Sequence, residues 1–298
     1  MGMNIHVVIN PASGQPQPIL HTLNHVFRAT GASWGISLTQ ESGDAERFAR
    51  QAAAAGADVV AAYGGDGTVM EVARGLIGSP ATMAILPGGT ANLLSVELGI
   101  PKKLELAAGL ICDPNSQVRQ VDAGMVGETF FLLRVGCGFP AHKVELADRQ
   151  LKDKYGIMAY SIAALKALSV AKMADYRLTL DGQVTQAKGM ACVVDNAGNM
   201  GTAWATHGKN ISVSDGLLDV ILVKDASFGT MIEVGQALAD HKPSDSYLHW
   251  QAREIGIEAD PPQPVQIDGE VGWQTPISIR VMPGVLKMLV PGGVNGKK

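Results

Sequence analysis

The sequence predicts an α/β protein with an N-terminal parallel-sheet domain and a C-terminal antiparallel β-sandwich domain. Strand patterns alternate with helical patterns over the first 110 residues, whereas closely spaced strand patterns follow residue 118. Alternation of strand and helix is typical of a parallel sheet covered by helices, and closely spaced strands are typical of a sandwich. At 298 residues, the chain is long enough for two such domains.

We place the first domain at residues 1–120 and the second at 121–282, with the segment 283–298 as a candidate to return to the first domain. Apolar residues make up 46% of the chain and charged residues 17%, which indicates a well-buried interior. The net charge of -4 provides no broad positive field, so nucleic acid is not an expected partner.

Targeting signals are not evident. The segment Met1–Asn10 lacks a basic leader, and no run of 18 apolar residues occurs. The three cysteines are widely spaced, a pattern that predicts neither a disulfide framework nor a zinc site. We therefore expect a cytoplasmic protein without a signal peptide.

The first part of the chain carries four strand patterns, each followed by a turn and a helical pattern. We expect strands at residues 5–9, 36–39, 58–62 and 83–86, and helices up to residue 29 and at 44–55, 68–76 and 91–98. Ligands of parallel sheets bind at the carboxyl ends of the strands, where the glycine-rich turns of this sequence fall.

The second part carries seven strand patterns interrupted by two helical stretches. The strands are expected at residues 118–122, 129–136, 176–181, 188–195, 217–223, 264–268 and 277–282, and the helices near 156–173 and 228–239. Turns such as Asp181-Gly182 separate the strands. The simplest interpretation is a sandwich with a helical insertion.

A glycine-rich turn joins the third strand to its helix. Residues 63–68 read Tyr-Gly-Gly-Asp-Gly-Thr. Glycines let the backbone approach a ligand closely, and the amides at a helix start attract a phosphate. Residues 86–92, Leu-Pro-Gly-Gly-Thr-Ala-Asn, repeat the arrangement one unit later. The two turns are predicted to enclose the phosphates of a nucleotide; the alternative is a pair of purely connecting turns.

Two acidic motifs follow in the second part. Asp268 and Glu270 come directly after an apolar strand, and residues two apart on an extended chain project to the same face. Crowding of two carboxylates would raise one pKa toward the range of a general base. The alternative is an Asp-Gly turn with solvated acids. Asp215-Gly216 by itself is consistent with a hairpin turn.

With these motifs, the chain resembles the bacterial branch of the diacylglycerol kinase catalytic-domain family, the YegS-like lipid kinases. The resemblance covers nearly the whole chain. The motifs that carry it are Asn10-Pro11 with Ser13-Gly14, Gly64 to Thr68, Pro87 to Asn92, Asp215-Gly216-Leu217-Leu218-Asp219 and Asp268-Gly269-Glu270.

The resemblance implies an ATP site, a cation site and a catalytic base. The implied ATP-binding residues are Thr39, Gly64, Gly65, Asp66, Gly67, Thr68, Val69, Met70, Gly89 and Thr90. Asp215 is implied to bind Mg²⁺ or Ca²⁺ with backbone oxygens of Ser212 and Leu217. The proton acceptor is implied to be Glu270 or Asp268, and Asp66 is a further catalytic candidate, for Mg²⁺ or for the acceptor hydroxyl.

The expected function is ATP-dependent phosphorylation of a lipid hydroxyl, on diacylglycerol, phosphatidylglycerol or a similar lipid reached by transient contact with a membrane surface. One departure from the family pattern is Met70, where the family usually has Asn. Two alternatives stay open: a kinase of a soluble hydroxyl compound such as NAD, and a lipid- or nucleotide-binding sensor without turnover.

Overall fold

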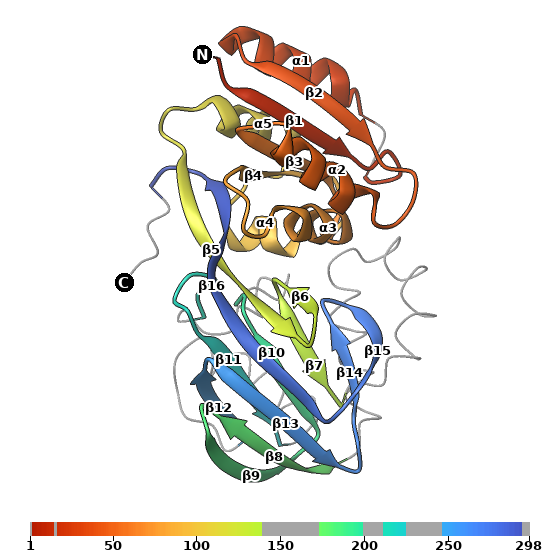
Figure 1. Cartoon of the computed structure of the whole chain (residues 1–298), viewed down its shortest axis with the longest axis vertical. Coiled ribbons are helices and arrows are strands. Elements are labelled where there is room, and N and C mark those ends of the chain that lie inside the picture. Colours follow the sequence, from red (N-terminus) through yellow and green to blue (C-terminus); the bar gives the residue numbers. More distant parts are fainter. Residues whose placement is uncertain (1, 15–16, 139–172, 199–210, 225–245, 294–298) are drawn as a thin grey trace. The chain divides into compact units, whose positions relative to one another are not determined.

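A computed structural model describes residues 2–14, 17–138, 173–198, 211–224 and 246–293 of the chain (Figure 1). Its contacts divide into two compact units, which we call unit 1 (Met1–Val121 with Gly284–Lys298) and unit 2 (Asp122–Pro283). Two long strands, β5 (Gln117–Val126) and β16 (Ile277–Val290), contain the residues at which the chain passes from one unit to the other.

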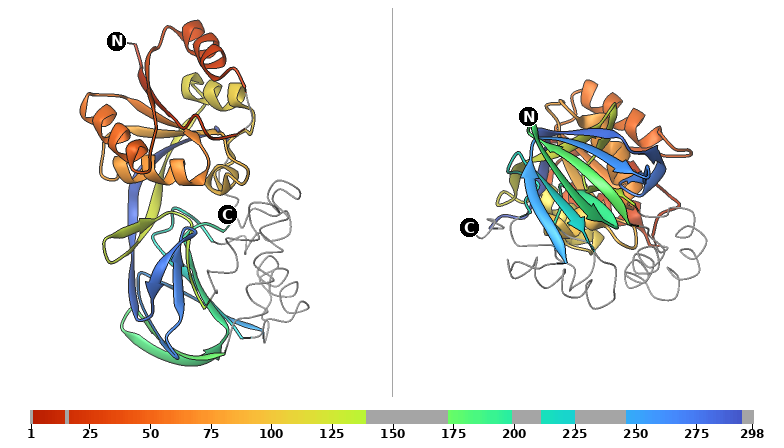
Figure 2. Two further views of the ribbon diagram at one scale, coloured as in Figure 1. Left: turned by 90° about the vertical axis from the view of Figure 1, so that its right-hand side faces the viewer. Right: turned by 90° about the horizontal axis from the view of Figure 1, so that it is seen from below.

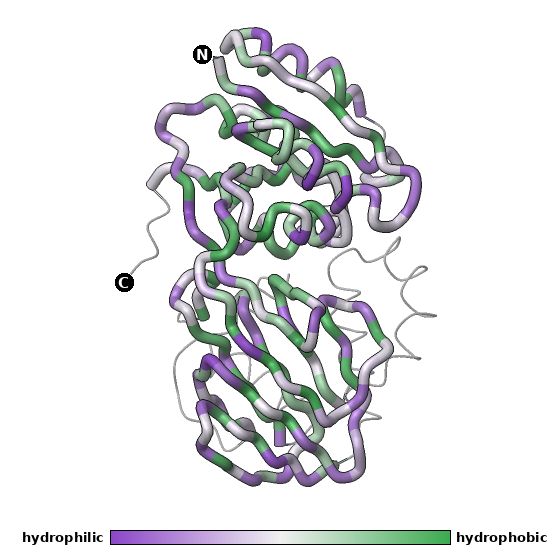
Figure 3. Tube along the Cα trace, in the orientation of Figure 1, coloured by the Kyte–Doolittle hydropathy of each residue, from purple (hydrophilic) through white to green (hydrophobic). Residues whose placement is uncertain are grey.

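Unit 1 contains a parallel sheet in the strand order β2-β1-β3-β4-β16. The further strands are β1 (Asn4–Ile9), β2 (Ser33–Leu38), β3 (Val59–Gly64) and β4 (Thr82–Pro87). Every residue of β3 is buried, as its continuous apolar run requires in a sheet covered on both faces. Figure 3 shows hydrophobic residues along the central strands and hydrophilic ones on the turns and outer helices.

Five described helices accompany this sheet: α1 (Ile19–Thr30), α2 (Asp44–Ala54), α3 (Asp66–Leu76), α4 (Leu93–Glu97) and α5 (Leu104–Cys112). Helix α1 packs with α5 on one face and α2 with α3 on the other (Figure 2). On α1, Leu23 and Phe27 are fully buried, and the Phe27 ring meets Trp34 edge-on at 5.6 Å. Helix α5 was not predicted, because its short apolar sequence lacks a polar face that would reveal helical periodicity.

Unit 2 is built from two sheets with antiparallel pairing. One has the order β12-β11-β10-β7-β14-β15, and the other continues from β16 through β13 and β8 to β9, with β5 and β6 beside it. The remaining strands are β6 (Thr129–Phe131), β7 (Arg134–Cys137), β8 (Ala174–Leu180), β9 (Gln183–Gly189), β10 (Ala191–Asp195), β11 (Leu218–Val223), β12 (Tyr247–Ala252), β13 (Glu254–Asp260), β14 (Pro264–Ile267) and β15 (Glu270–Gln274).

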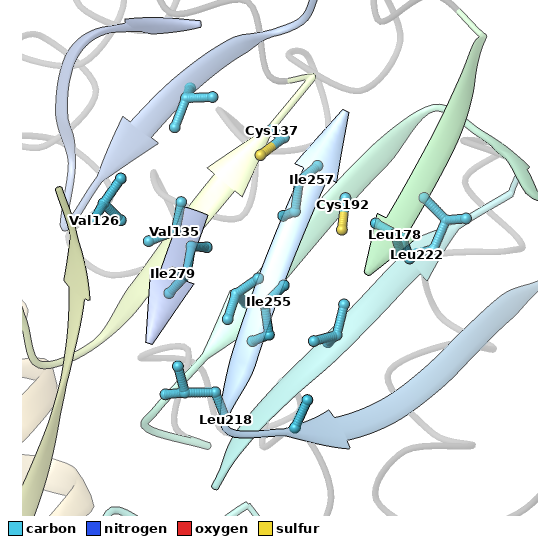
Figure 4. Packing of buried hydrophobic residues seen from close by; sticks show 14 of the residues in the cluster. Val126, Val135, Cys137, Leu178, Cys192, Leu218, Leu222, Ile255, Ile257 and Ile279 are labelled. Atoms are coloured by element: carbon cyan, nitrogen blue, oxygen red, sulfur yellow. The ribbon is translucent and has the colours of Figure 1, made fainter. Parts of the chain in front are cut away.

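The core of unit 2 lies among these strands. Figure 4 shows Cys137 and Cys192 within it, surrounded by aliphatic side chains such as Ile255 and Ile257. Burial raises the pKa of the Cys137 thiol to about 12, so this cysteine is an apolar core residue at neutral pH. Together with the parallel sheet of unit 1, the sandwich confirms the predicted fold class.

Some predicted elements differ from the observed ones. The strand expected at 129–136 is broken by a bend at Leu132 and Leu133, and the one expected at 188–195 is interrupted at Met190. Strands β12, β13 and β15 and most of β9 were not predicted, because charged, amide or glycine residues obscure their apolar alternation. The helices expected near 156–173 and 228–239 fall outside the described residues, apart from Met173.

Candidate functional site

Three turns meet at the carboxyl edge of the parallel sheet in unit 1. Strands β1, β3 and β4 are parallel neighbours, so the turns that follow them lie at the same edge. The amide of Asn10 donates to the Tyr63 carbonyl at 2.9 Å, and the amide of Gly88 donates to the Gly64 carbonyl at 2.9 Å. The two predicted glycine-rich turns are therefore brought together.

The turns touch through their backbones. A Cβ atom at Gly89 would lie 2.5 Å from the Cα atom of Gly65, and one at Gly14 would lie 2.3 Å from the Gly88 carbonyl oxygen. Neither distance is tolerated by a real side chain, so both glycines are required for packing. Gly65 differs, because its φ of -85° suits any residue and a Cβ atom there would lie 3.5 Å from the nearest neighbour, Gly89 Cα.

Helix α3 begins within the first turn, at Asp66 and not near Thr68 as predicted. Its N-cap residue is Gly65, which has no side chain to cap it, and the N–H groups of a first helical turn have no partners inside the helix. These groups carry partial positive charge, which is the property that binds a phosphate. Gly67, in this turn, is exposed.

The Asp66 carboxylate accepts hydrogen bonds from the end of the second glycine-rich turn. Its Oδ2 accepts the amide of Asn92 at 3.0 Å, and its Oδ1 accepts the amide of Leu93 at 2.7 Å. Burial raises the pKa of the Asp66 carboxyl above its ordinary value, although these amides oppose the shift. Asp66 thus positions the turns relative to each other; its predicted catalytic role stays a prediction.

Two asparagines that sequence reasoning treated only as motif members also hold this edge. Asn92 has a left-handed φ of 49°, accepts the Gly89 amide at 3.0 Å and donates to the Gly89 carbonyl at 2.6 Å. Asn10 donates through its side chain to Thr68 Oγ1 at 3.1 Å. An Asn after a Gly-Gly-Thr turn is a usable signal, because Asn tolerates left-handed backbone better than most residues.

The other predicted nucleotide contacts fall into two groups. Thr39 lies at the same edge, where its amide donates to the Ile9 carbonyl at 2.9 Å, and Thr90 is exposed beside Gly89. Val69 and Met70 are buried, at 2% and 6% exposure. The Met70 side chain therefore packs inside unit 1. Having Met where the family usually has Asn thus affects the packing of unit 1 first.

In unit 2, Asp268 and Gly269 form the two-residue turn between β14 and β15. Both have positive φ, 47° and 91°, the values of a type I′ hairpin turn, and Ile267 pairs with Glu270 across it. The extended geometry expected for this motif is therefore wrong, because positive φ at two successive residues reverses the chain. Glu270 is exposed at the start of β15.

The Asp268 carboxylate points back to the bend between β6 and β7. It accepts the amides of Leu132, Leu133 and Arg134 at 2.8, 3.0 and 2.7 Å. Burial raises the pKa of Asp268 to about 6, against the opposing effect of these three amides and of the Arg134 charge.

Asp215 precedes β11 in a bend. Its Oδ1 accepts the amide of Leu217 at 3.0 Å, and the amide of Gly216 donates to Asp122 Oδ2 at 2.7 Å. Burial raises the pKa of the Asp215 carboxyl, and the nearby charges of Asp219 and Asp122 raise it further. A local excess of negative charge is thus present.

Two families of known domains match the chain, one in each part. Residues 4–126 match the diacylglycerol kinase catalytic domain, and residues 134–290 match the YegS C-terminal NAD kinase beta sandwich-like domain. The chain belongs to the YegS-like and diacylglycerol kinase family of lipid kinases.

Members of this family resemble the chain over most of its length. A protein of Pseudomonas putida named probable lipid kinase YegS-like is 30% identical, over 90% of this chain and 88% of its own. The diacylglycerol kinase of Bacillus subtilis is 27% identical, over 91% and 90%. The crystal structure of a diacylglycerol kinase from Bacillus anthracis superimposes with a TM-score of 0.75 at 28% identity, covering 98% of each chain.

A lipid kinase of this family is expected to use a divalent cation, and the Asp215 segment supplies part of a site for one. Among the described residues, no three His, Cys, Asp or Glu side chains gather to hold a metal ion. A cation at Asp215 therefore needs backbone oxygens, such as those predicted for Ser212 and Leu217, and oxygen-only ligation suits Mg²⁺ or Ca²⁺. In the described part of the chain, no helix is both long and apolar enough to cross a membrane.

Proposed function

We propose that this lipid kinase family member uses ATP to phosphorylate a lipid hydroxyl, on diacylglycerol, phosphatidylglycerol or a similar lipid. The observation that carries the proposal is the backbone contact between the two glycine turns beside the start of α3. Such a surface lets phosphates approach amide N–H groups without side chains in the way. Transient contact with a membrane surface from the cytoplasm would supply the lipid.

The proposed reaction needs one base. The lipid hydroxyl oxygen attacks the γ-phosphorus of ATP, the bond from that phosphorus to the β–γ bridging oxygen breaks, and ADP leaves. The hydroxyl proton passes to a carboxylate, for which we propose Glu270, because it is exposed and Asp268 already accepts three amides. Mg²⁺, when bound, neutralises phosphate charge.

A soluble acceptor such as NAD is the second candidate. The likeness of residues 134–290 to an NAD kinase beta sandwich-like domain favours this alternative. Both candidates use the same glycine turns and differ only in the acceptor, so the nature of the phosphorylated product separates them.

The test is product identification by mass spectrometry. The purified protein is incubated with ATP and Mg²⁺ in three parallel samples that contain a total lipid extract, defined diacylglycerol and phosphatidylglycerol in mixed micelles, or NAD. We expect a lipid heavier by one phosphate group, formed only when both protein and ATP are present. Phosphorylated NAD without any lipid product would support the second candidate, and no product in any sample would contradict both.

A further inference from the structure

The turn that presents Glu270 is tied to a distant segment by four hydrogen bonds. Three are the bonds from the amides of Leu132, Leu133 and Arg134 to the Asp268 carboxylate. The fourth runs from the Asp268 amide to the Arg134 carbonyl at 2.9 Å. The turn is therefore fixed relative to the β6–β7 bend, more than 130 residues away in sequence.

This geometry requires a carboxylate and not simply a turn-forming residue. Asn-Gly and Asp-Gly both favour a type I′ turn. An Asn side chain, however, has a single acceptor oxygen, and its NH₂ group would face an amide N–H that needs an acceptor. Because Asp268 uses both oxygens, Oδ2 for Leu132 and Oδ1 for Leu133 and Arg134, an amide cannot replace all three bonds.

A second Asp-Gly turn of unit 2, away from Glu270, is also anchored by its aspartate. Asp181 and Gly182 form the turn between β8 and β9, with φ of 47° and 84°. Asp181 Oδ1 accepts the amides of Arg253 and Glu254 at 2.9 and 2.8 Å, and the Asp181 amide donates to the Glu254 carbonyl at 2.9 Å. Here the carboxylate only anchors a hairpin.

We infer that Asp268 is a positioning residue that anchors the hairpin presenting Glu270 and does not itself take the proton. The inference rests on the proposed function, since Glu270 acts as a base only in a kinase. It follows from the likeness of the two turns: the carboxylate does the same work at Asp181, where Gln183 stands in place of Glu270. The turn at Asp268 differs from the turn at Asp181 in the acidic residue, Glu270, that follows it.

Four variants separate anchoring from proton transfer. Asp268→Asn keeps a favourable turn residue, and Asp268→Gly keeps the left-handed backbone while removing the side chain. Asp181→Gly is the matched control, because it removes the carboxylate from the equivalent turn. Glu270→Gln removes the proposed base. Amide hydrogen exchange is measured without substrate, and kcat and KM for ATP are measured with the lipid substrate at a single mildly basic pH.

The anchor predicts faster exchange at Leu132 and Glu270 in both Asp268 variants and also at Leu133 and Arg134 in Asp268→Gly. In Asp181→Gly, exchange should be faster at Arg253 and Glu254 alone. The Asp268 variants should lose about 10- to 100-fold in kcat, as a misplaced reactive group does, with KM for ATP within about twofold. The loss of kcat in both Asp268 variants should be smaller than the loss in Glu270→Gln. Asp181→Gly should keep the wild-type kcat.

Three results would overturn the inference: unchanged exchange at Leu132 to Arg134, wild-type kcat in the Asp268 variants, or a larger loss of kcat in Asp268→Asn than in Glu270→Gln. If Asp268→Asn does not fold, Asp268→Gly decides by the same criteria. A wild-type protein that phosphorylates no lipid contradicts the proposed function instead. The exchange measurement needs no substrate and still decides whether Asp268 anchors the turn.

Discussion

Asp66-Gly67 in unit 1 and Asp268-Gly269 in unit 2 look alike in sequence, and in each pair the aspartate accepts backbone amides from a distant segment. Their backbones differ. Asp66 starts a helix, whereas Asp268 has left-handed φ in a hairpin turn. The comparison teaches that the same dipeptide starts a helix in one unit and forms a hairpin turn in the other, so the surrounding strands decide its role.

The largest effect is expected at Glu270, the acidic residue that follows Asp268-Gly269. Glu270→Gln should lower kcat on the order of 10²–10⁴-fold with ATP affinity unchanged, because the isosteric amide removes a positioned base. Steady-state kinetics and calorimetric ATP titration measure the two quantities. Gln183→Glu, which places an acid after the equivalent turn, should leave kcat unaltered. Near wild-type turnover in Glu270→Gln would make Asp66 the leading candidate for the base.

The partly buried Asp268 carboxyl predicts a pH dependence of stability. Its folded-state pKa of about 6 lies above the ordinary 3.8, so the folded protein holds the proton more tightly. The stability that this group contributes is fully present below pH 3.8 and is lost as pH rises through about 6. The loss is at most about 3 kcal/mol.

Thermal unfolding of the wild type and Asp268→Asn from pH 4 to 7 tests this dependence. The Tm difference between them should move in favour of the variant as pH rises, because the variant has no charge to bury. A difference independent of pH would show that Asp268 does not titrate in this range.

Asp66→Asn should destabilise unit 1 by about 1–3 kcal/mol, since one of the two amides bound to Asp66 loses its acceptor in a partly buried setting. Asp58→Asn is a control from the same unit, where an exposed carboxylate accepts the single amide of Asn4 at 2.7 Å. Chemical denaturation compares them. A larger loss at Asp58 than at Asp66 would contradict the holding role of Asp66.

The smallest effect concerns a third Asp-Gly pair, Asp215-Gly216, whose aspartate accepts the amide of Leu217 within its own segment. Asp215→Ala should reduce the rise in Tm that Mg²⁺ produces, by a few degrees, because bound cation stabilises only the folded state. Melting curves with and without Mg²⁺ measure it. Equal shifts in variant and wild type would remove Asp215 from the cation site.

Sequence reasoning found the fold class and both glycine turns because each depends on local patterns: alternating elements, and glycines directly after apolar strands. It could not find that Gly89 is required by its contact with Gly65, which is 24 residues away and visible only once β3 and β4 pair. Close backbone approach between turns leaves no local signature.

The geometry predicted for Asp268-Gly269-Glu270 was wrong for a related reason. The rule that residues two apart share a face holds for an extended chain, and Asp268 and Gly269 are not extended. The Asp-Gly dipeptide itself signalled the turn, and that alternative describes the backbone correctly. The partners of the carboxylate, Leu132 to Arg134, are too distant in sequence to be inferred.

Nucleotide binding at the glycine turns underlies both candidate functions, and calorimetric titration with a non-hydrolysable ATP analogue tests it most directly. Gly65→Ala suits this test, because φ and space at Gly65 tolerate a Cβ atom while its methyl group would obstruct a phosphate. Gly109→Ala on α5, where a Cβ atom has no neighbour within 4 Å, is the matched control. We predict wild-type affinity for the control and at least a tenfold loss, about 1.4 kcal/mol, for Gly65→Ala. Equal affinity in a folded Gly65→Ala protein would contradict the phosphate site.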